Sequence, residues 1–411
     1  MSRQVRVTAL KYKRLPALRS VKQIKVLIVG SATIALASAS ALATFANIVR
    51  QASPGSVLRY VPGDALAPAI AADTALIEGK GSHPDVIARS AKLALSRQAI
   101  NARALRVLAL TSGAKRERNR FVAASEALSR RDLGTQLLLI QSSVERDDAR
   151  QALNHYDIAL RTSNAAPAIL FPILTSAIED PQIQAALAPI VGRQPVWLRD
   201  FLSFAIANSA RPSDLAAAIM RARRLPDSPD FHLLESSLIA RLIAVGDGMA
   251  ARLFYATLRG ARPGEIAATG FAEATIDPRF APLTWDPVVD ANTEVSVLDD
   301  GKGFRVVARS GAKAVVLRRV LFLPPGRRAL RTTIGLADRS NESGIYIAIR
   351  CVRADTSGQI WLSPNLARPG PLPPQDFVVP EKCNSQMVEL LVSTGATQQG
   401  LEFEIREFSV V

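Results

Sequence analysis

The sequence is poor in the residues that carry most enzyme chemistry. It contains 2 cysteines and 3 histidines among 411 residues, and only 5% of its residues are aromatic. Two cysteines cannot form a four-cysteine zinc site or a dense disulfide framework, and three histidines leave little material for a histidine-rich metal centre. Glycine and proline are near average usage, which excludes a collagen-like or low-complexity chain. What remains, 48% hydrophobic and 21% charged residues, indicates a folded chain of about two or three domains.

Known catalytic motifs are also absent from the sequence. It has no G-x-S-x-G elbow, no G-x-x-x-x-G-K-[ST] phosphate loop and no H-E-x-x-H zinc motif. The histidines, His83, His155 and His232, all fall in segments with ordinary helical patterns. The acidic pairs Asp147-Asp148 and Asp299-Asp300 are adjacent in sequence and so do not share a helix or strand face. The sequence therefore predicts no catalytic residue, no cofactor and no metal ion.

The net charge of +15 is concentrated at the N-terminus. Residues 1–25 hold eight Lys and Arg and no Asp or Glu, and residues 26–49 carry no charge at all. A helix over residues 26–49 is long enough to cross a hydrocarbon core of about 30 Å. Basic residues before an apolar span predict a cytoplasmic tail (1–25), a transmembrane signal anchor (26–49) and an exported remainder. Much of the charge is thus a topology signal, and nucleic acid is not the expected partner.

Two other interpretations of the apolar segment remain. The stretch Ala37-Ser38-Ala39-Ser40-Ala41 offers cleavage sites for a secretory signal, which would also export the chain. Alternatively, the segment is a core helix of a soluble protein. The uncleaved anchor is favoured because apolar residues continue through Phe45 and Val49, and because core helices rarely avoid charge for so long.

Beyond a Pro- and Gly-rich connector (50–70), residues 71–262 show helical periodicity. Amphipathic or apolar segments follow one another in pairs, at 85–95 with 101–110, 119–128 with 133–140, and 147–160 with 169–177, and single segments follow at 196–207, 213–223 and 231–242. The pairs recur at roughly 30 to 40 residues, and residues 99–110 and 147–160 resemble parts of tetratricopeptide-type repeats. This predicts an α-helical (TPR-like) solenoid, which would bind protein partners.

From residue 263 the pattern changes to short strands. Segments rich in Val, Ile and Leu alternate with turn clusters and occupy residues 294–298, 303–308, 313–322, 329–335, 344–352, 359–363, 386–393 and 401–408. Such spacing predicts a C-terminal antiparallel β-sandwich over 263–411.

The order of several short motifs in this part suggests a family. Gly270-Phe271, Pro282 to Trp285, the turn ending at Gly326, Phe377 to Pro380 and the two cysteines together resemble a jelly-roll-like, carbohydrate-binding-like domain. That domain follows a tetratricopeptide-like array in some membrane-anchored proteins of alphaproteobacteria, often found among exopolysaccharide functions. The resemblance implies a single-pass inner-membrane protein whose bulk is periplasmic.

The two cysteines, Cys351 and Cys383, are the only thiols of the exported part. A disulfide between them is the simplest outcome in an oxidising compartment. Two buried inert thiols, or a catalytic or metal-binding pair, are the alternatives.

Binding residues in the sandwich are predicted from aromatic and basic side chains. Trp285 and Trp361 could stack on a sugar ring or pack in the core. Basic residues on neighbouring predicted strands, among them Arg318, Arg319, Arg327 and Arg328, could form a positive face for an acidic polysaccharide or for phospholipid headgroups, or a merely solvated face.

Two functions from different classes follow. The first is a non-enzymatic, membrane-anchored scaffold that recruits protein and glycan in envelope or exopolysaccharide assembly or export. The alternative is a polysaccharide-modifying enzyme with an unrecognised site in the sandwich. An acidic cleft in the sandwich would favour the enzyme, and an apolar concave surface on the helices would favour the scaffold.

Overall fold

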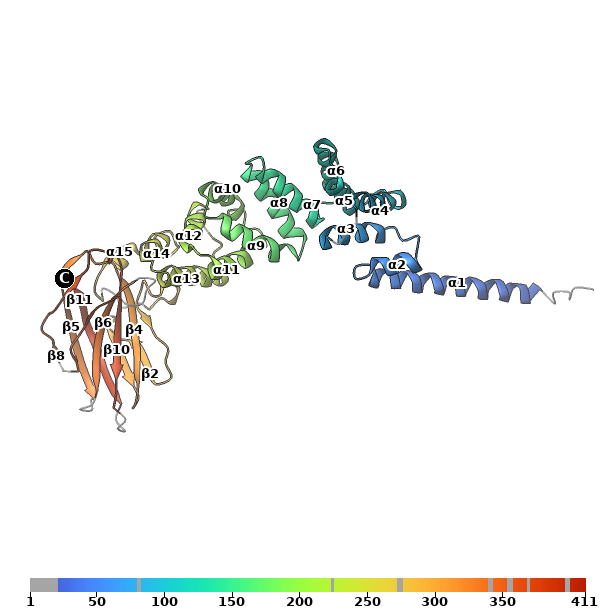
Figure 1. The fold of residues 1–411 in the computed structure, drawn as a ribbon. Coiled ribbons are helices and arrows are strands. Elements are labelled where there is room, and N and C mark those ends of the chain that lie inside the picture. The colour runs from blue at the N-terminus through green and yellow to red at the C-terminus, as the bar shows by residue number, and fades with distance from the viewer. Residues whose placement is uncertain are drawn as a thin grey trace, which may run out of the picture. The chain divides into compact units, whose positions relative to one another are not determined.

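The computed structural model describes residues 21–79, 83–222, 225–271, 276–338, 343–352, 358–367, 370–395 and 400–411. Most of the predicted basic tail lies outside these residues. The chain divides into two compact units, Met1–Leu138 and Leu139–Val411. The first unit is helical, and the second combines helices with a C-terminal β-sandwich (Figure 1).

The N-terminal unit begins with one long helix, α1 (Val21–Val49). Its segment Ser31–Val49 is long and apolar enough to cross a membrane, and only 6% of it is buried in the protein. The predicted connector, 50–70, is folded: it contains α2 (Pro54–Tyr60) and the first residues of α3 (Ala67–Glu78). Val57 of α2 is fully buried against Ala46 of α1 and Ala67 of α3.

Three further helices complete this unit before α7 (Leu133–Val144). They are α4 (Pro84–Arg97), α5 (Ala102–Thr111) and α6 (Lys115–Leu128). Small residues such as Ala91 and Ala104 are fully buried, which lets neighbouring helices approach closely. The two predicted pairs at 85–110 and 119–140 correspond to α4 with α5 and α6 with α7.

A buried charge network links three of these elements. Arg106 of α5 donates two hydrogen bonds to Asp73 of α3, at 2.7 and 2.9 Å, and one to Asp132, just before α7, at 2.7 Å. Burial alone would raise the pKa of Asp132, but the charge of Arg106 and hydrogen bonds from Thr135 lower it. Because a buried charge is costly unless it is paired, the network fixes the relative positions of α3, α5 and α7.

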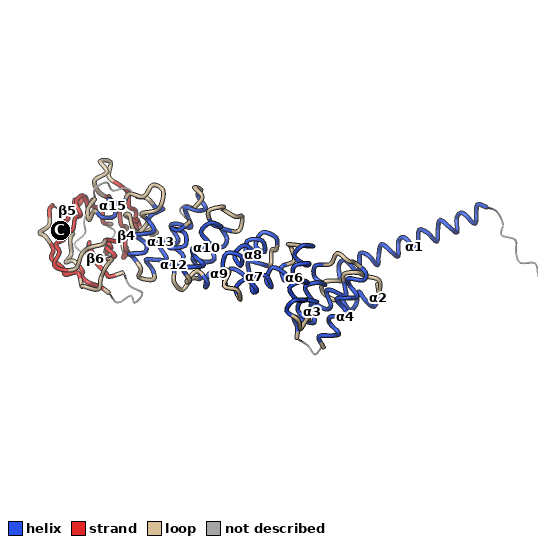
Figure 2. Tube along the Cα trace, turned by 90° about the horizontal axis from the view of Figure 1, so that it is seen from above, coloured by secondary structure: helices blue, strands red, loops and turns tan. Residues whose placement is uncertain are grey.

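The helices of the C-terminal unit pack in two rows (Figure 1), and seen from above they follow one another toward the sandwich (Figure 2). One row contains α8 (Ala149–Thr162), α10 (Pro181–Val191), α12 (Pro212–Arg221) and α14 (Gly248–Tyr255), and the other contains α9 (Ala166–Ala177), α11 (Leu198–Asn208) and α13 (Pro229–Ala244). Successive members of a row begin at intervals of roughly 30 to 40 residues, as the sequence pattern predicts.

Local signals set the starts of these helices. Asp148, Asp180 and Asp247 accept hydrogen bonds from backbone N–H groups in the first turns of α8, α10 and α14. Proline occupies the first position of α10, α12 and α13, where its missing N–H costs nothing. Helices α10 and α14 were not among the predicted segments, because each carries few polar residues to mark its periodicity.

The sandwich consists of two antiparallel sheets, which confirms the predicted C-terminal fold. In chain order its strands are β1 (Asp286–Pro287), β2 (Thr293–Val297), β3 (Phe304–Ala308), β4 (Lys313–Leu321), β5 (Gly326–Asp338), β6 (Gly344–Cys351), β7 (Gln359–Leu362), β8 (Gly370–Pro371), β9 (Gln375–Val379), β10 (Gln386–Ser393) and β11 (Leu401–Val410). The first sheet has the order β1-β4-β10-β6-β7, and the second has the order β2-β3-β11-β5-β8, with β9 also paired to β5.

Alternation of apolar and polar residues places one face of each sheet in the core. Along β3, Phe304, Val306 and Ala308 are buried while Arg305 and Val307 are exposed. The buried face of β11 is made by Leu401, Phe403 and Ile405. All eight predicted strands are present, and three strands that the prediction missed within the described residues, β1, β8 and β9, are short strands of two to five residues.

Candidate binding site

A crevice with a volume of about 460 Å³ lies between α13 and the outer face of the first sheet. Three neighbouring strands supply its polar floor: Arg318 comes from β4, Glu389 from β10 and Arg350 from β6. Ala240, Ile243 and Ala244 of α13 and Met387 of β10 supply apolar surface. The crevice therefore combines hydrogen-bonding groups with an apolar wall, which is typical of small-ligand sites.

Every charged group on this floor has a partner. Arg350 is ion-paired with Glu389, and the Arg318 Nε donates to Asp286 of β1 at 2.7 Å. The positive charges of Arg318 and Arg350 are balanced by the negative charges of Asp286 and Glu389, so the site has no net attraction for an anion. It can instead offer alternating donors and acceptors to a neutral polar ligand, because each carboxylate oxygen has more than one acceptor direction.

Arg319, the next residue on β4, does not contribute to a binding face. Only 2% of its surface is exposed, and its side chain donates to the backbone carbonyls of Glu265 at 2.5 Å and Ala268 at 3.2 Å, with two longer bonds to Gly270 and Leu283. These carbonyls lie in and after the short helix α15 (Pro263–Ala267), on the segment that joins the helices to the sandwich. The prediction of a glycan-binding role for Arg319 is therefore wrong, because alternation along β4 turns its side chain inward.

Trp285 is a core residue, the alternative that the sequence left open. It is 4% exposed and packs against Phe271, Phe304 and Phe408, with ring centroids 5.1 to 5.9 Å apart, and the guanidinium of Arg319 lies 5.6 Å from its ring. A buried ring cannot offer its face to a sugar.

Trp361 lies on β7, at the edge of the first sheet. It is half-buried and stacks on Phe377 of β9, with centroids 5.7 Å apart and an interplanar angle of 30°. Since β9 belongs to the second sheet, this contact closes the side of the sandwich. One face of the Trp361 ring is thus used for packing.

Arg327 and Arg328 lie at the beginning of β5, in the second sheet, whereas Arg318 lies in the first. Arg327 is exposed, and Arg328 donates to the carbonyl of Pro324. Consecutive strands were expected to be neighbours, but β4 and β5 belong to opposite sheets. The interpretation of these arginines as one positive face is therefore corrected to separate arginines on two sheets, while an acidic polysaccharide or phospholipid partner stays a prediction.

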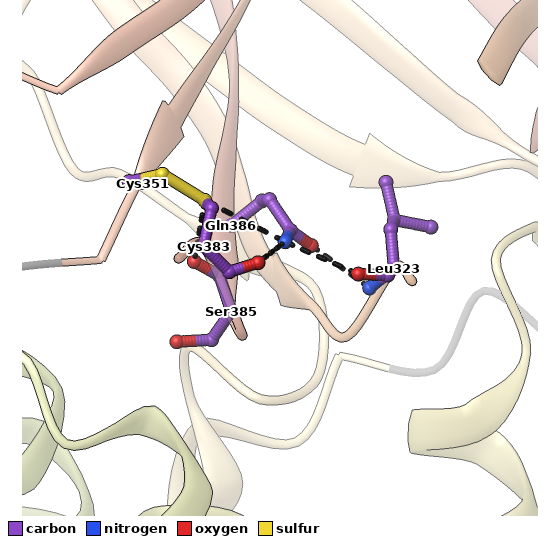
Figure 3. The surroundings of a disulfide bond; sticks show 5 residues. All are labelled: Leu323, Cys351, Cys383, Ser385 and Gln386. Carbon is purple, nitrogen blue, oxygen red and sulfur yellow. Dashed lines mark hydrogen bonds between the residues drawn. A yellow bond between two sulfur atoms is a disulfide. The ribbon is translucent and has the colours of Figure 1, made fainter. Parts of the chain in front are cut away.

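The cysteines form a disulfide, which confirms the predicted pairing of Cys351 with Cys383. The bond joins the end of β6 to the loop before β10 (Figure 3). At the start of β10 the buried Gln386 donates to the carbonyl of Cys383 in this loop at 2.6 Å and accepts from the N–H of Leu323 at 2.8 Å. Because Cys351 also lines the crevice, the disulfide holds the end of its floor in place.

The three histidines do not line this crevice. His155 is buried in α8, His83 precedes α4, and the His232 Nε2 lies 2.8 Å from Asp227 in a small pocket beside α13. The hydrogen bond from His232, together with Arg259, lowers the pKa of Asp227. Within the described residues, no group of three or more His, Cys, Asp or Glu side chains is placed to hold a metal ion.

A second crevice of about 460 Å³ lies on the helical rows of the C-terminal unit. It is lined by Phe171 of α9, Phe204 of α11 and Leu233 of α13, and charged residues such as Arg199 and Asp230 surround it. Leu233 is 67% exposed. An apolar patch with a charged rim is a surface on which an apolar side chain of another protein could be buried.

Comparison with known proteins yields no family. No family model and no curated protein matches the chain. A solved structure of the carbohydrate-binding module TmCBM61 in complex with β-1,4-galactotriose aligns with 31% of this chain and 87% of its own length, at 11% identity and a TM-score of 0.22. At that TM-score the similarity carries no argument about this protein's ligand.

Proposed function

We propose that this protein is a membrane-anchored scaffold without enzymatic activity. In this proposal the helices that follow α1 and the sandwich lie outside the cytoplasm. The observation that carries the proposal is the combination of a basic, then apolar N-terminus with a disulfide near the other end of the chain. Basic residues before a span favour a cytoplasmic N-terminus, and structural disulfides persist in oxidising compartments. Both features favour the same, periplasmic side of an inner membrane.

Protein partners would bind the helical rows. The crevice lined by Phe171, Phe204 and Leu233 supports this part of the proposal, since it offers apolar surface within a charged rim. The tetratricopeptide-like spacing of the helices is consistent with such a role, and a place in envelope or exopolysaccharide assembly or export is part of the same proposal.

A glycan would bind the crevice between α13 and the first sheet. Its balanced charges favour an uncharged segment, with hydroxyl groups donating to Glu389 and accepting from Arg318 and Arg350. The enzymatic alternative would need a carboxylate free to move a proton. Here Glu389 and Asp286 are each engaged by a guanidinium group, which supports binding rather than catalysis.

The proposal is tested by the topology of the full-length chain. A phosphatase that is active only outside the cytoplasm should be active when it is fused after Val411. A fluorescent reporter that folds only in the cytoplasm should remain dark at the same position. Replacing all eight basic residues of 1–25 by Gln should weaken this orientation. Cytoplasmic fluorescence of the unmodified fusion would refute the proposed localisation and, with it, the role.

A further inference from the structure

The apolar helix α1 is longer than a bilayer requires. It has 29 residues, and the uncharged part begins at Val26. From Val26 to Thr44 the helix spans about 28 Å, close to the thickness of a hydrocarbon core of about 30 Å. Every described side chain from Ser31 to Thr44 is exposed. At Phe45 the surroundings change, because Phe45, Ala46 and Val49 are covered by protein.

The covering is provided by α2, which runs back along the end of α1. Tyr60, the last residue of α2, contacts Phe45 edge to face with ring centroids 5.8 Å apart. Arg50 follows the apolar segment directly, and its Nε and Nη2 both donate to Oδ2 of Asp64, at 3.2 and 2.7 Å, while Oδ1 of Asp64 accepts from the N–H of Ala67 at the start of α3. Charged residues are rare within the hydrocarbon, and protein covers one side of α1 from Phe45 onward, so we place the boundary of the bilayer near Phe45.

The end of α2 therefore lies at the depth of the lipid headgroups. Tyr60 is 60% exposed despite its contact with Phe45, and Arg59 beside it is exposed and forms no ion pair within the described residues. Tyrosine is enriched at membrane interfaces, because its ring is apolar and its hydroxyl is polar, and arginine is attracted to lipid phosphates. Ile48, three residues after Phe45, is 73% exposed, as suits a residue at the edge of the hydrocarbon.

We propose that α2 is a membrane-surface contact, in which Arg59 and Tyr60 bind the headgroups of the leaflet from which α1 emerges. Together with the Arg50–Asp64 pair, this contact would hold α3 and the rest of the N-terminal unit at a fixed height above the bilayer, instead of letting it swing on a flexible tether. The inference rests on the proposed anchor role of α1, and its partner is the lipid surface itself.

The depth of single nitroxide labels tests the inference. Because Cys351 and Cys383 are joined, a cysteine introduced elsewhere is the sole free thiol. The full-length chain carrying Ala41→Cys, Tyr60→Cys or Ile77→Cys is labelled and reconstituted in vesicles of phosphatidylcholine and phosphatidylglycerol, and the collision rates of each label with oxygen and with a nickel chelate are measured. Ile77 is the control because it is 79% exposed near the end of α3, which lies beyond the end of α1 (Figure 1).

The label at 41 should favour oxygen, the label at 77 should favour nickel, and the label at 60 should have an intermediate ratio. Arg59→Cys, which keeps the contact of Tyr60 with Phe45, should give the same intermediate ratio. If positions 59 and 60 match position 77 while 41 is in the hydrocarbon, the anchor stands and the surface contact is refuted. If the labels at 59 and 60 favour oxygen as strongly as the label at 41, they lie in the hydrocarbon, and the surface contact is also refuted. If 41 matches 77, the anchor itself is refuted.

Discussion

At the scale of single residues, Arg319 joins the helical part of the C-terminal unit to the sandwich. Its guanidinium is the donor for four backbone carbonyls between Glu265 and Leu283, and burial lowers its pKa. Removing the donor leaves these carbonyls without a partner, and an unsatisfied buried polar group costs about 1 to 3 kcal/mol.

Arg319→Met should therefore lower the free energy of unfolding by about 2 to 4 kcal/mol. Arg318→Met is the matched control, because the neighbouring side chain is exposed and its ion pair with Asp286 is worth at most about 1 kcal/mol. Urea unfolding followed by circular dichroism measures both variants. Equal stability of the two variants would contradict the structural role of Arg319.

Asp132 makes the stability of the N-terminal unit sensitive to acid. Its pKa is lowered in the folded state, so its contribution is complete above the unfolded pKa of about 4 and is lost as the pH falls from there through the folded pKa. We expect the melting temperature of this unit to fall as the pH decreases from about 5 to about 3.

Asp132→Asn should be less stable at pH 7 and should show a weaker pH dependence between pH 5 and pH 3, as measured by thermal melts of the full-length chain in detergent. The control is Asp85→Asn, since the side chain of Asp85 is 85% exposed. An unchanged acid dependence in Asp132→Asn would show that other carboxylates control the transition.

At the scale of secondary-structure elements, the disulfide ties β6 to the loop that leads into β10. It closes a loop of 32 residues, and in the chain-entropy model a loop of this size stabilises the folded state by about 3 to 4 kcal/mol. The loop contains β7, β8 and β9, the short strands at the edge of the sandwich. Their positions depend on the bond more than those of the central strands do.

Cys351→Ser with Cys383→Ser should therefore shift the unfolding of the sandwich to lower guanidinium concentration. Tryptophan fluorescence in a Trp197→Phe background follows this transition, because the remaining tryptophans, Trp285 and Trp361, both lie in the sandwich. The control is the same background with both cysteines intact and oxidised. Coincident transitions would mean that the bond contributes nothing measurable to stability.

At the scale of the whole molecule, the proposed anchor would determine on which side of a membrane the two units lie. Helix α1 runs without interruption through the alanine-rich stretch at 37–41, and its C-terminal end packs into the N-terminal unit through Ala46. An uncleaved α1 predicts that the full-length chain stays with carbonate-washed membranes, as measured by immunoblotting. Replacing Ala39 and Ala41 by Leu should leave the length of the chain unchanged. Release of a shorter product beginning near Ala41 would instead show a cleaved signal.

The sequence by itself determined the order of the parts: an apolar N-terminal helix, paired helices and a C-terminal sandwich. These features depend on local periodicity, charge and turn residues, which act between neighbours in the chain. It also indicated the pairing of Cys351 with Cys383, because no other thiol is present.

Only the tertiary structure decided which side chains share a surface. The pairing of strands placed β4 and β5 in opposite sheets, so that Arg318 was separated from Arg327 and Arg328, while Glu389 and Arg350 from distant segments were brought beside Arg318. Similarly, α2 is folded and packs against the end of α1, because its apolar residues are buried against α1 and α3. Such contacts join residues far apart in the chain, and no local pattern specifies them.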